Sequence, residues 1–146
     1  MVTLFVTAGS DADSTIELWT ENLGTVEFFL TGYWSDPPGT YVEAGEDLGL
    51  ASTDSLWEAQ SLAIYGVPAG AVVQIGLSNQ SDLSENHIGV RQVGSTLLRT
   101  LNLHEAESGG EDFATMHVQT GQGAMVERYH QDVSDDHHFY LFGWWE

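Results

Sequence analysis

Short segments rich in β-branched and aromatic residues recur along the whole chain, separated by turns of glycine, serine, asparagine and aspartate. No segment holds a convincing helical period of apolar residues through three turns. Beyond Asp36 the pattern predicts eight strands, over residues 40–43, 55–65, 71–77, 86–93, 96–103, 113–119, 125–130 and 138–145. Strands and turns at this spacing are typical of a sandwich. We therefore predict an all-β fold, an antiparallel, jelly-roll-like β-sandwich.

Residues 54–63 hold the strongest competing pattern. Leu56, Ala59, Leu62 and Ala63 are spaced as they would be on one face of a short helix. The sequence favours a strand in this segment, with the short helix as the alternative.

The run Asp36-Pro37-Pro38-Gly39 predicts a boundary, because neither proline can donate a hydrogen bond to a strand ladder. Before it, residues 3–7, 15–20 and 25–30 are predicted to form a three-stranded meander. We therefore divide the chain into an N-terminal three-strand element, residues 1–35, and an eight-stranded sandwich unit, residues 36–146.

An internal similarity supports this division. Residues 3–9 are similar to residues 115–121, and residues 28–34 are similar to residues 139–145, at nearly the same offset. Glu17 and Glu127 occupy matching places between them. Residues 1–35 are therefore predicted to be a partial repeat. Three strands alone form a marginal sheet, so this element must pack on its own unit or on a neighbouring chain.

Acidic residues dominate the charge. The chain has 22 Asp and Glu, no lysine and three arginines, Arg91, Arg99 and Arg128, for a formal net charge of −19. Binding to nucleic acid or anionic membranes requires clustered cations, so we expect neither partner. The sequence has no apolar run of membrane-spanning length and no basic start of a secretory signal. We expect a soluble, unexported chain without membrane insertion.

The absence of lysine also constrains the environment. A folded chain of this mass exposes about 7,400 Å², or about 390 Å² for each uncompensated negative charge. Such self-repulsion erodes a fold at low ionic strength, whereas at about 1 M salt the screening length falls to about 3 Å. The composition favours a molar-salt environment over the alternative, an ordinary acidic protein of a mesophile.

Three stretches of the second unit carry a resemblance. They are residues 89–95 (Gly-Val-Arg-Gln-Val-Gly-Ser) with Arg99, residues 103–110 (Leu-His-Glu-Ala-Glu-Ser-Gly-Gly), and the closing residues 139–145 (Phe-Tyr-Leu-Phe-Gly-Trp-Trp). Together they resemble a repeat unit of virion structural proteins of tailed viruses, found in head-decoration, tail and fibre components. With the salt argument, the resemblance implies a virion protein of a tailed virus of a halophilic archaeon. No catalytic residues come with it.

Arg91 and Arg99 flank the turn at Gly94 and Ser95. A guanidinium can hold carboxylates bidentately within such a hairpin. We predict that they clamp the acidic loop 103–110 through Glu105 or Glu107. The alternative is two unrelated surface positions.

Histidines and acidic turns raise the question of a metal. The run His104-Glu105-Ala106-Glu107 is not a zincin motif, and its side chains would alternate between the faces of a strand. We expect hydrogen-bonded or solvent-facing histidines at positions 104, 117, 130, 137 and 138. The acidic turns at residues 10–14 and 132–136 lack the spacing of a calcium loop, and a cation there or at a subunit contact stays open. The chain has no cysteine for a disulfide or a thiolate ligand.

Enzyme motifs are absent from the sequence. We find no nucleophile elbow, phosphate-binding loop or dinucleotide fingerprint, and we expect a protein without enzymatic activity or cofactor.

Tryptophans offer a clearer indication of recognition. Trp144 and Trp145 cannot both face the core of a regular strand. We predict that Trp34, Trp144 and Trp145 contribute to a protein interface, with a sugar platform as the alternative.

The sequence therefore predicts a homo-oligomeric virion component, a capsid decoration or turret protein that contacts other virion proteins. The alternatives are a tail-fibre or receptor module that binds a host surface glycan, and a host-encoded halophilic protein of unrelated role.

Overall fold

The computed structural model describes residues 39–49, 51–80, 85–104, 112–132 and 137–146. They form eight strands and one 3-10 turn, η1 (Ala63–Tyr65). The strands are β1 (Gly39–Asp47), β2 (Leu56–Ser61), β3 (Val72–Asn79), β4 (Glu85–Gln92), β5 (Thr100–His104), β6 (Asp112–Gln119), β7 (Met125–His130) and β8 (His137–Trp145). Each of the eight strands predicted beyond Asp36 is present. Among the described residues no helix is long and apolar enough to cross a membrane.

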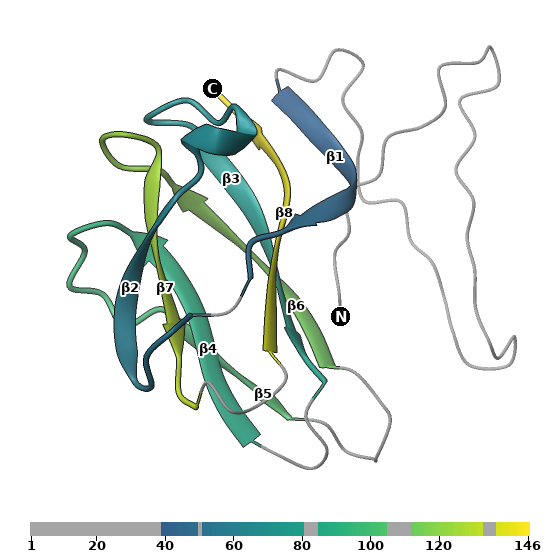
Figure 1. Cartoon of the computed structure of the whole chain (residues 1–146), viewed down its shortest axis with the longest axis vertical. Helices are drawn as coiled ribbons and strands as arrows, with labels where there is room; N and C mark the ends of the chain where they lie inside the picture. Colours follow the sequence, from purple (N-terminus) through teal and green to yellow (C-terminus); the bar gives the residue numbers. More distant parts are fainter. Residues whose placement is uncertain (1–38, 50, 81–84, 105–111, 133–136) are drawn as a thin grey trace, which may run out of the picture.

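The strands form two antiparallel four-stranded sheets that pack face to face (Figure 1). One sheet has the order β1-β8-β3-β6 and the other β2-β7-β4-β5. Strands β1 and β8, β2 and β7, β3 and β6, and β4 and β5 pair with each other. This is the order of a long hairpin rolled up so that successive strand pairs fall in opposite sheets. The all-β, jelly-roll-like sandwich is therefore confirmed.

Side-chain alternation builds the core between the sheets. Burial alternates residue by residue along β7, and in β8 from His137 to Gly143. The central strand β3 is buried almost throughout. The fully buried apolar residues include Val73, Ile75, Leu77, Ile88, Val90, Val126, Phe139 and Leu141.

A β-bulge near the end of β8 changes which face its last residues occupy. Ile75 pairs with Leu141 but its neighbour Gln74 pairs with Gly143, so Phe142 is an extra residue. After the bulge, Trp144 lies opposite the core residue Val73.

Two predicted strands are shorter than expected. The segment 55–65 is a strand only to Ser61, after which η1 begins and Gly66 ends it in the left-handed conformation. The segment 96–103 becomes a strand only at Thr100, because Thr96–Arg99 belongs to the connection after β4. The predicted element 1–35 and the repeat proposed for it lie outside the described residues.

Candidate functional site

An ion pair crosses the outer face of the second sheet. Arg91 on β4 and Glu127 on β7 are register partners, and Arg91 Nε lies 2.6 Å from Glu127 Oε2. Each side chain is only 16% exposed. The Arg91 guanidinium also lies 4.0 Å from the ring centroid of Trp57, which contacts Tyr129 at 5.3 Å. This pair is therefore shielded from solvent on one side by an aromatic ring.

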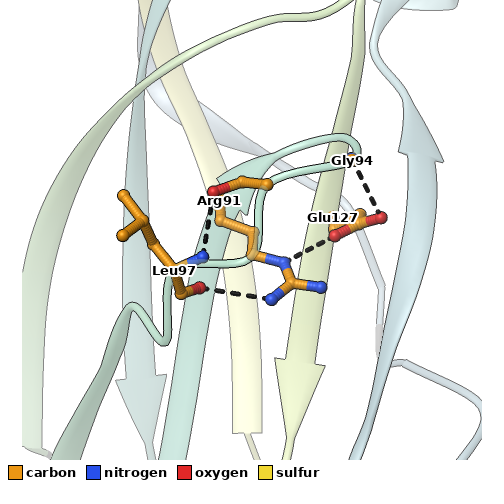
Figure 2. A network of polar contacts seen from close by, with 5 residues as sticks. Arg91, Gly94, Leu97 and Glu127 are labelled. Carbon is orange, nitrogen blue, oxygen red and sulfur yellow. Dashed lines mark hydrogen bonds and ion pairs between the residues drawn. The ribbon is translucent and has the colours of Figure 1, made fainter.

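The same two side chains fix the β4–β5 connection, residues 93–99 (Figure 2). The backbone N–H of Gly94 donates to Glu127 Oε1 at 3.3 Å, and Arg91 Nη1 donates to the Leu97 carbonyl at 3.2 Å. Within the connection, Ser95 Oγ accepts from the Leu97 N–H at 3.2 Å. Gly94 has a φ of 76°, which suits glycine. These contacts hold the backbone while Leu97 and Leu98 remain 65% and 76% exposed.

Glycine at position 89 allows β4 to approach the same connection. A Cβ added there would lie 2.0 Å from the Arg99 carbonyl oxygen. One local unit therefore contains four residues from the stretches that resemble the virion repeat unit: Gly89, Arg91, Gly94 and Arg99.

Arg99 holds the other side of the connection. Its Nη2 donates to the backbone carbonyl of His117 on β6 at 3.0 Å. Burial, with the charge of Arg99, lowers the pKa of His117. Glu105 and Glu107, the predicted partners of Arg91 and Arg99, lie outside the described residues. The carboxylate that the structure brings to Arg91 is Glu127.

The two C-terminal tryptophans make different contacts. Trp144 packs against the core, whereas the Trp145 ring meets the His117 ring at 5.3 Å. Both are partly buried. Trp34 lies outside the described residues, and an interface role for the three tryptophans stays a prediction.

A polar cluster lies between the sheets, and the sequence analysis did not predict it. Arg128 is 6% exposed, and its Nη1 donates to the carbonyls of Leu48 and Gly49 at 2.8 and 2.6 Å. His130 is fully buried, with neither ring nitrogen hydrogen-bonded. Its ring meets that of His137 at 4.5 Å, edge to face. The expected hydrogen-bonded or solvent-facing histidine is therefore wrong at position 130. The available signal was alternation, since Val126, Arg128 and His130 share one face of β7.

Burial dominates the electrostatics of this cluster. It lowers the pKa of Arg128, opposed by the charge of Glu58, and lowers the pKa of His130 to about 4, together with His137 and Arg128. In the described part of the chain no three His, Asp or Glu side chains are grouped as metal ligands. The buried guanidinium of Arg128 would repel a further cation, and the lowered pKa of His130 keeps that imidazole neutral at neutral pH.

Comparison with known proteins adds no family: no protein-family model and no curated protein matches the chain. Any function proposed for this chain therefore depends on its fold and on the contacts of its residues. What their arrangement provides is a rigidly held connection that presents leucine side chains.

Proposed function

We propose that this chain is a non-enzymatic virion protein, an oligomeric capsid decoration or turret component of a tailed virus with a halophilic host. The jelly-roll order of the strands carries the proposal, because capsid proteins are among the proteins built on that architecture.

Two further observations support it. The residues that resemble the virion repeat unit hold the β4–β5 connection in place, through the Arg91–Glu127 pair and the Arg99–His117 contact. The net charge of −19 matches a surface that works in concentrated salt.

Purified particles provide the direct test. Mass spectrometry of salt-stable virions from halophilic hosts should detect the chain at a fixed high copy number. Its absence from particles made by cells that express it would reject the virion assignment.

A receptor or carbohydrate-binding module, as in a tail fibre, is the second candidate. Rings from β6 and β8 follow one another over the outer face of the first sheet, with Phe113, Phe142, Tyr140 and His138 in sequential contact. Aromatic faces bind sugars, and lectins also use the jelly roll. Saturable binding on a glycan array would favour this function.

Salt dependence tests the halophilic part of the proposal. Lowering NaCl from the molar range to about 0.1 M extends screening to about 10 Å and should lower the melting temperature substantially. Circular dichroism melts measure it. A melting temperature that is unchanged or higher in low salt would contradict a halophilic origin.

A further inference from the structure

Three connections meet at one end of the sandwich. Residues 62–71 follow β2, residues 93–99 follow β4, and residues 120–124 follow β6 (Figure 1). Backbone hydrogen bonds join the first and third, from the Leu62 N–H to the Ala124 carbonyl and from the Thr120 N–H to the Ala71 carbonyl. A Cβ added at Gly121 would lie 2.3 Å from Val93, so the second connection touches the third. The three connections therefore form one continuous surface.

The three connections contribute no carboxylate side chain to this surface, and the Glu127 carboxylate of β7, which reaches Gly94, is paired with Arg91. None of the 22 Asp and Glu residues falls in the three connections, which we name together the carboxylate-free end. At the opposite end, where β1 and β7 finish, the described residues of the connections that follow them include Asp54 and Asp132. Glu146 follows β8 at the carboxylate-free end but belongs to none of its connections. Among the described residues of the connections, carboxylates are therefore found at that opposite end alone.

Apolar exposure has the opposite distribution. Ile64, Leu97 and Leu98 are 77%, 65% and 76% exposed, and all three lie on the carboxylate-free end. The other large apolar side chain that is strongly exposed among the described residues, Leu56 at 56%, begins β2 at the opposite end. Arg91 and Ser95 already hold the backbone that carries Leu97. Burying the Leu97 side chain against a partner therefore costs little additional conformational entropy.

We propose that the carboxylate-free end is where a second copy of this chain docks. Two molecules of net charge −19 repel each other least when the surfaces they bring together hold no carboxylates. The end has a single Lys or Arg residue, Arg99, whose Nη2 is already bonded to the His117 carbonyl. An apolar surface with one arginine and no carboxylate in its connections complements its own copy, because the copy is acidic overall and exposes apolar side chains at the same place, whereas a basic partner would find no opposite charge in the connections. The proposal rests on the oligomeric part of the proposed function and locates its contact.

The test is self-association of the full chain in molar NaCl, measured by sedimentation velocity over a range of concentrations. Leu97→Asp and Leu98→Asp should each weaken association about tenfold or more, because each places a carboxylate where a leucine is buried. Leu56→Asp is the matched control, with the same change in side chain and charge at the opposite end, and it should associate like the wild type. Circular dichroism verifies that each variant is folded.

The possible outcomes separate the two proposals. Association of Leu98→Asp equal to that of Leu56→Asp would overturn this inference and leave the oligomeric virion protein standing. A wild-type chain that stays monomeric in molar salt would overturn both the contact and the oligomeric part, while particle mass spectrometry still decides the virion assignment. Variants that self-associate normally but fail to enter particles would assign the end to another virion protein and overturn docking of a second copy. If substitution at Leu97 or Leu98 prevents folding, Ile64→Asp makes the same test from a separate connection.

Discussion

The two faces of β7 both carry polar side chains, in two different environments. Glu127 and Tyr129 face outward, where Glu127 neutralises Arg91 and fixes a connection. Arg128 and His130 face inward, where a guanidinium is held by backbone carbonyls and an imidazole has no hydrogen bond. The outer arginine is partly solvated and paired, so its loss has a limited cost. The inner one is desolvated, and its removal leaves buried acceptors without a donor.

The largest expected effect comes from Arg128→Met. It removes the donor to the Leu48 and Gly49 carbonyls, so we expect the free energy of unfolding to fall by about 2–4 kcal/mol. Denaturant unfolding in molar salt measures it. Arg91→Met makes the same chemical change on the outer face and should cost only about 1 kcal/mol. Equal losses in the two variants would contradict the contrast between the faces.

Acidification should lower the free energy of unfolding through His130 on the inner face of β7. A pKa of about 4 for His130 lies below its ordinary value of 6.5, so the unfolded chain binds this proton more readily than the folded chain. This contribution is fully present above the unfolded pKa and is lost as pH falls from about 6.5 towards 4. Between pH 7 and 5 the loss should be about 2 kcal/mol.

His130→Phe should remove that part of the pH dependence, because a phenyl ring binds no proton. The exposed His87 provides the control, and His87→Gln should keep the wild-type acid dependence. Urea unfolding at pH 7 and pH 5 gives the values. The same loss on acidification in His130→Phe as in the wild type would contradict a buried, unprotonated imidazole.

Local sequence pattern predicts the elements, and least well where individual side-chain contacts decide. The strand 125–130 is found at its predicted residues, and β8 begins one residue before its predicted start. The predicted strand 96–103 is too long, because Arg91 and Ser95 bind Leu97 and hold it outside the ladder. Thr96 favours a strand by composition, whereas the hydrogen bond from the Leu97 N–H to Ser95 Oγ favours a turn, and the contact of Arg91 with the Leu97 carbonyl is not visible in the local pattern.

The site follows the same rule. The importance of Arg91 can be predicted from the scarcity of cations, but its partner Glu127 is 36 residues away and meets it only when β4 and β7 pair. Glu105 and Glu107 are nearer in sequence and were therefore the natural prediction. The burial of Arg128 is harder to predict, since arginine is mostly exposed and only the alternation of β7 places it inside.

The smallest expected effect is that of Glu127→Gln on the outer face. Glutamine can still accept from the Gly94 N–H, but Arg91 loses its opposite charge. Removing any carboxylate from a chain of net charge −19 also relieves repulsion, and this partly offsets the loss. The exposed Glu146 measures that general term, because Glu146→Gln changes the net charge equally without disturbing the pair. Relative to this control, Glu127→Gln should lower the free energy of unfolding by about 0.5–1 kcal/mol in 0.5 M NaCl, and by less at higher salt.

Hydrogen exchange at the Gly94 and Leu97 amides should become faster in Glu127→Gln alone, because the ion pair anchors the connection on which both lie. Unchanged exchange at these amides would mean that Ser95 and the turn suffice to hold Leu97, and that the outer ion pair contributes no order to the carboxylate-free end.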